Sequence, residues 1–102
     1  MKRRLTATEV VANLAKLDNW RLNGDGDQVV IEKTFTFDSF HQTMAFVNAL
    51  AFIAHGKNHH PELVLRSQHC VVRYQTHDVS GITLADFESA TRVDALLTPT
   101  PA

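Results

Sequence analysis

Apolar and polar residues recur along the chain with two different periods, and these periods predict its helices and strands. Near the N-terminus, apolar residues recur every three or four positions, which is typical of a helix with one buried face. They are Val10, Val11, Leu14 and Leu17. Thr6 and Glu9 have the spacing of a capping box, so we expect this helix to begin at Thr6 and to end at Asp18.

Two segments with strand periodicity follow. Residues 20–22 and 29–37 alternate apolar and polar side chains. Between them, residues 23–27 are Asn, Gly and Asp, which tolerate positive φ, so the pattern predicts a β-hairpin. We interpret Trp20, at the start of the first strand, as a core anchor and not as a platform for a ligand.

The next segment predicts the longest helix. Asp38 or Ser39 can cap it, and Ser39 with Gln42 has capping-box spacing. Gly56 is placed to end the helix before Pro61. Apolar residues form one face and a second set widens it. The face is Phe40, Met44, Val47, Ala51 and Ala54, and the wider set is Phe46, Leu50 and Ile53. So wide an apolar surface suggests that the helix is also buried against a second subunit.

A second hairpin follows this helix. Residues 63–66 and 70–74 read as strands, and the short connector at 67–69 joins them. Residues 76–81 have the composition of a loop. Because consecutive strands joined by a tight turn pair antiparallel, the far end of the second strand should return to the start of the first.

A final helix completes the pattern and sets the expected fold class. Thr83 and Asp86 have the spacing of a helix start, and the apolar side comprises Leu84, Phe87, Ala90, Val93, Ala95 and Leu96. The order predicts an α+β fold (α-β-β-α-β-β-α), a four-stranded antiparallel sheet covered on one face by three helices. We expect a single domain over residues 1–102, with an ordered core at about 6–97 and a flexible tail at 98–102.

Composition narrows the classes of function. The 102 residues are 44% hydrophobic and 21% charged, and their formal net charge of -1 argues against nucleic-acid binding. Cys70 is the sole cysteine, so no disulfide forms within the chain, and its alternating apolar surroundings predict a buried side chain more than a nucleophile. No apolar stretch reaches membrane-spanning length and no signal-peptide core is present, so we expect a cytoplasmic protein without a membrane anchor.

A histidine cluster is the candidate site. His59 and His60 lie where the longest helix should end and the third strand should begin, and His55 lies one helical turn earlier. His77 follows the fourth strand, whose end the hairpin should return to His59 and His60. Imidazoles titrate near neutral pH, so the cluster predicts an acid/base or binding pocket. We interpret the other two histidines as surface or capping residues.

A zinc site is an alternative interpretation of the same cluster. His55 and His59 have the spacing of two ligands on one helical face. However, Gly56 and Pro61 disfavour a regular helical turn at this point, and no acidic residue lies between the two histidines. The residues themselves therefore favour a metal-free pocket, without deciding between catalysis and binding.

Three segments resemble the signature of the pterin-4a-carbinolamine dehydratase family. They are GKNHHPE at residues 56–62, YQTHD at 74–78 and GITLAD at 81–86. The resemblance extends over residues 6–96 and includes Trp20. The combination is much more specific than any one of these segments.

The resemblance implies an enzyme, a 4a-hydroxytetrahydrobiopterin dehydratase (a hydro-lyase). Members of the family remove water from a 4a-hydroxytetrahydropterin to give a quinonoid dihydropterin, in the recycling of tetrahydrobiopterin after aromatic amino-acid hydroxylation. They need no metal and no organic cofactor. By position, the implied catalytic residues are His59, His60, His77 and Asp86. We also predict that His55, Asn58, Pro61 and Thr76 bind the substrate.

We assign roles to these residues as a hypothesis. His59 and His77 share the acid and base roles, and His60 orients the pterin. Asp86 fixes a histidine tautomer or holds the hydrogen bonds of the pocket. Four positions depart from the common pattern of the family, and they affect the expected substrate contacts more than the histidines. These are His55, Leu63, Ser67 and Ala85.

The resemblance also permits a function of another class. The chain would then be a noncatalytic, dehydratase-like module for binding, assembly or coactivation. The three retained histidines favour the enzyme. In either case we expect a homodimer or homotetramer, because the sheet has free edges and the longest helix is unusually apolar.

Overall fold

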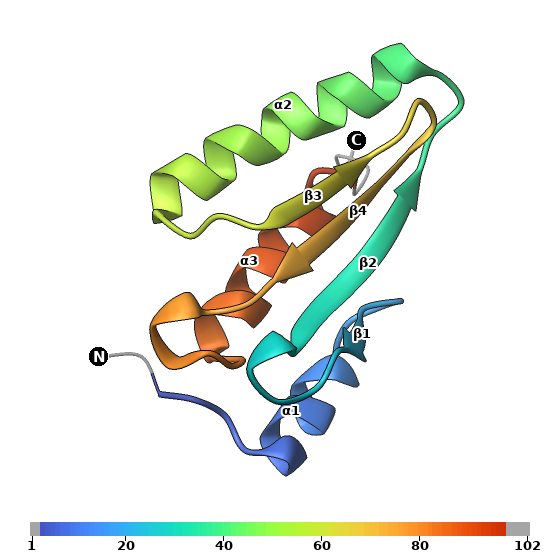
Figure 1. Cartoon of the computed structure of the whole chain (residues 1–102). Helices are drawn as coiled ribbons and strands as arrows, with labels where there is room; N and C mark the ends of the chain where they lie inside the picture. Colours follow the sequence, from blue (N-terminus) through green and yellow to red (C-terminus); the bar gives the residue numbers. More distant parts are fainter. Residues whose placement is uncertain (1–2, 98–102) are drawn as a thin grey trace, which may run out of the picture.

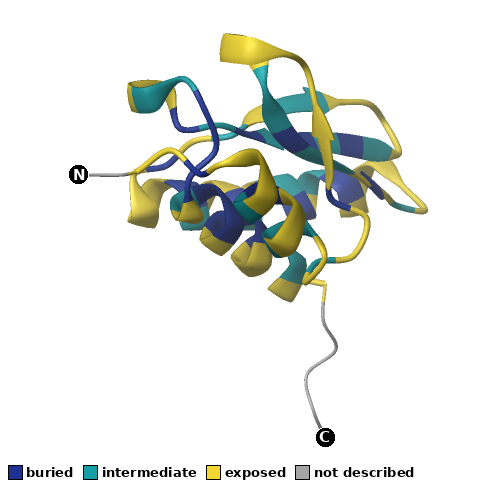
Figure 2. Ribbon diagram, turned by 90° about the horizontal axis from the view of Figure 1, so that it is seen from below, coloured by how far each residue is buried: buried dark blue, intermediate teal, exposed yellow. Residues whose placement is uncertain are grey.

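The computed structural model describes residues 3–97 and confirms the predicted α+β class (Figure 1). The elements are α1 (Ala7–Leu14), β1 (Arg21–Asn23), η1 (Gly26–Gln28), β2 (Val30–Thr36), α2 (Phe40–Lys57), β3 (Glu62–Leu65), β4 (His69–Tyr74), η2 (His77–Val79) and α3 (Leu84–Ala95). The elements η1 and η2 are short 3₁₀ helices. Figure 2 shows the α-helices gathered on one side of the sheet, with buried residues between the layers. The tail predicted at 98–102 lies outside the described residues.

The two predicted hairpins join into one antiparallel sheet with the strand order β1-β2-β4-β3. β4 is a central strand and pairs with both β2 and β3. Its last residues therefore lie between the beginnings of two strands, since Tyr74 faces Ile31 on β2 and Arg73 faces Glu62 on β3. This register brings the loop after β4 close to the segment that joins α2 to β3.

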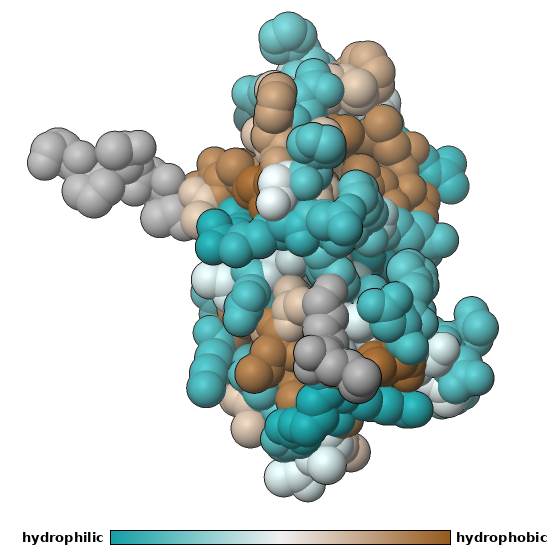
Figure 3. Space-filling model, turned by 90° about the vertical axis from the view of Figure 1, so that its left-hand side faces the viewer, coloured by the Kyte–Doolittle hydropathy of each residue, from teal (hydrophilic) through white to brown (hydrophobic). Residues whose placement is uncertain are grey.

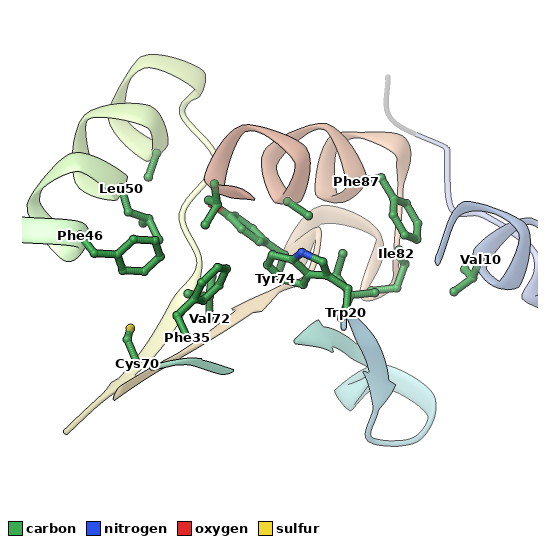
Figure 4. Close-up of a cluster of buried hydrophobic side chains, with 14 of the residues drawn as sticks. Val10, Trp20, Phe35, Phe46, Leu50, Cys70, Val72, Tyr74, Ile82 and Phe87 are labelled. Atoms are coloured by element: carbon green, nitrogen blue, oxygen red, sulfur yellow. The ribbon is translucent and has the colours of Figure 1, made fainter. Parts of the chain in front are cut away.

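One apolar core lies between the sheet and the helices. On β4, Cys70, Val72 and Tyr74 are buried, and the alternate residues are half-buried. Figure 4 shows the side chains from the strands and the helices meeting in this layer. Trp20 is a buried core residue, as predicted, and its ring packs edge-on against Phe35 with centroids 6.1 Å apart.

The buried faces of the three α-helices differ in part from those that periodicity predicted. On α2 the buried residues are Thr43, Phe46, Leu50 and Ala54, whereas the predicted face residue Phe40 is 56% exposed. Val11 on α1 and Leu84 on α3 are also exposed, not buried. α2 carries apolar residues nearly all round, so its sequence does not define one stripe.

The end of α2 also differs from the prediction. The helix continues through Gly56 to Lys57, and Asn58 adopts a left-handed conformation with φ of 49°. The backbone N–H of Asn58 donates to His55 and that of His59 donates to Ala54, which is a Schellman arrangement. Asn tolerates left-handed φ, so it can end a helix as glycine does.

No helix among residues 3–97 has the length and apolar character needed to cross a membrane.

We predict that Tyr74, the single tyrosine of the chain, ionises only at strongly alkaline pH. Burial raises the pKa of its phenol from 10.0 to about 12, the Ser89 hydroxyl opposes this change, and the Asp86 carboxylate adds to it. Folding thus favours the neutral phenol. The contribution of the neutral phenol to the free energy of unfolding is fully present below about pH 10 and is lost as the pH rises towards 12.

Tyrosinate absorbance measures this ionisation directly, with circular dichroism to verify the fold. The native midpoint should lie near 12, and the midpoint in denaturant near 10. The Tyr74→Phe variant is the control, because its absorbance change should vanish. A native midpoint near that of the unfolded chain would contradict the prediction.

Candidate functional site

A polar cleft of about 310 Å³ lies on the face of the sheet that the helices leave open. Its lining residues are Asn23, Gly24, Gln28, Val30, His60, Glu62, Arg73, Gln75 and His77. They come from the turn between β1 and β2, the start of β3 and the end of β4. In Figure 1 this region is where the segment after α2 and the loop after β4 approach each other. Figure 3 shows that hydrophilic side chains cover much of the adjoining side of the molecule.

Two of the predicted histidines, His60 and His77, line this cleft and are exposed. His60 lies in the short segment before β3, and His77 is the first residue of η2 after β4. The pairing of Glu62 with Arg73 brings these two segments together. The predicted approach of His77 to His60 is thus a consequence of strand register.

The third histidine, His59, lies behind the cleft in the core. It is 8% exposed and is not among the lining residues. Its Nε2 lies 2.6 Å from Oδ1 of Asp86. Its ring stacks on Tyr74 with centroids 5.5 Å apart and planes within 4°. Both the rotation and the position of the imidazole are therefore fixed.

Asp86 is fully buried and is the centre of a hydrogen-bond network. Its Oδ2 accepts from the backbone N–H of Thr83 at 2.9 Å and from the hydroxyl of Thr76 at 2.9 Å. The hydroxyls of Thr76 and Thr83 lie 2.8 Å apart. Asp86 also lies in the first turn of α3, where the helix dipole favours a negative charge. These contacts offset the loss of hydration that burial imposes on a carboxylate.

The loop that carries His77 is closed by backbone contacts. Thr76 and Gly81 form a β-bridge across it. The N-terminal segment crosses the loop, because the N–H of Leu5 donates to the carbonyl of Ile82 at 2.8 Å. A Cβ at Gly81 would lie only 2.7 Å from Nε of Arg4, so this close approach requires glycine or a shift of the arginine.

The four predicted substrate-binding residues do not line the cleft. His55 is exposed on the last turn of α2, and Asn58 is the exposed cap that follows. Pro61 is half-buried, and Thr76 is buried in the Asp86 network. Their assignment as substrate contacts stays a prediction that this geometry does not support.

The alternative chemistries also have little support among residues 3–97. No group of three or more His, Cys, Asp and Glu side chains there is placed to hold a metal ion. The Cys70 thiol is buried, and burial raises its pKa. A buried thiol of this kind is less readily converted to the thiolate that a nucleophile needs.

Sequence reasoning missed most of the cleft. Arg73 on β4 and Gln75 just after it lie on the open face, because they alternate with the buried residues Val72 and Tyr74. Glu62 joins them through its pairing with Arg73. The alternation was visible in the sequence, but the cross-strand partners depend on register, which the sequence did not define to the residue.

Comparison with known proteins agrees with the resemblance seen in the sequence. A family model described as Pterin 4 alpha carbinolamine dehydratase matches residues 3–96. A protein of Paracidovorax citrulli is 52% identical over 96 residues, which cover 94% of this chain and 83% of the relative. A protein of Bdellovibrio bacteriovorus is 45% identical over 96 residues, which cover 90% and 77%. Both carry the name "Putative pterin-4-alpha-carbinolamine dehydratase".

Two solved structures share the fold. A transcriptional coactivator/pterin dehydratase from Brucella melitensis is 30% identical, with a TM-score of 0.86 and coverage of 94% of this chain and 100% of that one. A pterin dehydratase-like protein, identified as a RuBisCO assembly factor in the alpha-carboxysome, is 27% identical, with a TM-score of 0.68 and coverage of 81% and 94%. From the family match over nearly all the described residues and from these relatives, we conclude that the chain belongs to the pterin 4 alpha carbinolamine dehydratase family.

Proposed function

We propose that this protein dehydrates a 4a-hydroxytetrahydropterin to a quinonoid dihydropterin. The observation that carries the proposal is the pair of exposed imidazoles, His60 and His77, on one polar cleft of about 310 Å³. That volume suits a small heterocyclic ligand. Membership of the family supports the same reaction. The product would return to the tetrahydrobiopterin pool through a reductase.

The reaction needs two proton transfers and no electron transfer. The C4a–O bond breaks as an acid protonates the leaving hydroxyl, which departs as water. A base removes the proton from a ring nitrogen, and the electron pair of that N–H bond forms the new C=N bond. Imidazole suits both tasks because its ordinary pKa lies near neutral pH.

We assign these tasks to His60 and His77, because both side chains line the cleft. The sequence-based hypothesis gave the acid and base roles to His59 and His77. His59 is buried and its Nε2 is engaged by Asp86, which supports a positioning role for it. Within this proposal, His59 anchors the backbone of His60, its neighbour in the chain.

We predict that His60→Ala and His77→Ala each lower kcat about 100-fold or more, the usual range for loss of a general acid or base. The measurement is dehydration of a 4a-hydroxytetrahydropterin by purified protein. His41→Ala is the matched control, since His41 is exposed at the opposite end of α2 and should be neutral. Normal turnover by either site variant would refute the assignment.

A binding or assembly module is a second candidate function, and the surface of α2 favours it. Phe52 is 80% exposed and Phe40 is 56% exposed. An apolar groove of about 370 Å³ lies between α2 and the end of α3, lined by Phe37, Gln42, Ala45, Phe46, Ala49, Leu96 and Leu97. Apolar side chains also gather over α2 near the top of Figure 3. Exposed apolar surface of this kind marks contact with another protein.

We predict that this surface joins copies of the chain into a homodimer or homotetramer. The Phe52→Glu variant should show a lower molar mass than the wild type in light scattering, because a charge buried at the contact would weaken association. Val11→Glu, on the exposed face of α1, is the control and should leave the mass unchanged. A wild type that stays monomeric at high concentration would rule out self-association. A folded wild type without dehydratase activity would favour the module over the enzyme.

A further inference from the structure

A row of alternating charges crosses the open face of the sheet. Register places Arg21 opposite Glu32, Glu32 opposite Arg73, and Arg73 opposite Glu62, so the row contains one residue from each strand. Only two of the four, Arg73 and Glu62, line the cleft with His60 and His77. The row therefore runs from Arg21 and Glu32, which lie outside the cleft, into the candidate site.

Arg73 is held from both sides. Its Nη1 donates to Oε1 of Glu62 at 3.0 Å, and its Nε donates to Oε2 of Glu32 at 3.4 Å. The Arg73 side chain is 31% exposed and that of Glu32 is 13% exposed. Nη2 of Arg73 and Oε2 of Glu62 make no hydrogen bond with residues 3–97. Arg73 and Glu62 both line the cleft, so together they bring one further donor atom and one further acceptor atom to its lining, and the ion pairs restrict both side chains.

That donor and acceptor complement one edge of a pterin. The pyrimidinone ring has a carbonyl oxygen, O4, next to an N3–H donor and a 2-amino donor. We infer that Arg73 and Glu62 recognise this edge, with Nη2 of Arg73 donating to O4 and Oε2 of Glu62 accepting from N3–H and the 2-amino group. The inference rests on the proposed function and names the specificity-determining residues of that site.

The same contact would orient the reacting carbon. C4a is bonded directly to C4, the carbon that carries O4. Holding O4 at Arg73 therefore keeps C4a within the cleft that His60 and His77 line. A role in folding alone explains Glu62 less well, because its side chain is 68% exposed and exposed ion pairs contribute little to stability.

The test compares two ligands that differ at one group. Lumazine has a carbonyl where pterin has the 2-amino group, so it offers an acceptor to Glu62 in place of a donor. Fluorescence titration of each ligand should show that the wild type binds pterin about 10-fold more tightly or better, the discrimination expected for one charged hydrogen bond. Glu62→Gln should abolish this preference, because an amide can donate to lumazine.

Arg73→Leu should weaken both ligands about 10-fold, because O4 is present in each. In the dehydration assay it should raise KM in proportion and change kcat less. Arg21→Leu is the matched control, since it removes a charge of the same row that lies outside the cleft. It should leave both affinities unchanged. If Arg73→Leu fails to fold, Glu62→Gln decides, because the Glu62 side chain is 68% exposed.

The outcomes separate this inference from the proposed function. A wild type that dehydrates the hydroxypterin, with a ligand preference that Glu62→Gln does not alter, overturns the inference and leaves the proposed function intact. A wild type that neither binds pterin nor catalyses dehydration overturns both. Loss of the preference in Glu62→Gln, with Arg21→Leu unchanged, supports the inference.

Discussion

The buried carboxylate of Asp86 is the constraint on which the geometry of the site depends. It ties together the end of α2 through His59, the end of β4 through Thr76 and the start of α3 through Thr83. A carboxylate without water must keep its hydrogen-bond partners, because an unpaired buried charge is strongly destabilising. One residue therefore holds together the segments that follow α2 and β4 and the start of α3.

This network supports both cleft histidines through their neighbours in the chain. His59 is buried and His60 is exposed, and in the same way Thr76 is buried and His77 is exposed. In each pair the first residue bonds to Asp86 and the second lines the cleft. Because the two residues of each pair are adjacent in the chain, fixing the first residue also restrains the position of the second. Each of the two segments therefore contributes one residue to the buried network and one residue to the cleft.

Much of the fold follows from local signals in the sequence. Thr6, Ser39 and Thr83 cap the three α-helices as their spacing predicted, because a hydroxyl near a helix start can satisfy an unpaired N–H within a few residues. The two hairpins were also predictable, since turn residues and period-two alternation are local. These features explain the four strands and the neighbourhood of His77 and His60. The pairing of β2 with β4, which joins the two hairpins into one sheet, is a contact between distant residues.

The features that the sequence did not predict depend on contacts between distant residues. α2 is apolar on too many sides for its core face to be read from periodicity. Phe46 and Leu50, from the predicted wider set, are buried, whereas Phe40 is exposed, contrary to the prediction. The helix ends at Asn58 and not at Gly56, because a left-handed cap allows the N–H of His59 to reach Ala54. Of the neighbours His59 and His60, His59 is the buried one because it bonds to Asp86, 27 residues further along the chain.

The most direct test of this account is the effect of Thr76 on pterin binding. Thr76 is buried and does not line the cleft, so it can influence a ligand there only indirectly, through the Asp86 network and its neighbours in the chain. Titration with pterin should show that Thr76→Val weakens binding about 10-fold and lowers the free energy of unfolding by about 1–3 kcal/mol, whereas Thr76→Ser, which keeps the hydroxyl, stays near the wild type. Unchanged pterin affinity in a folded Thr76→Val variant would contradict the claim that the buried network shapes the cleft.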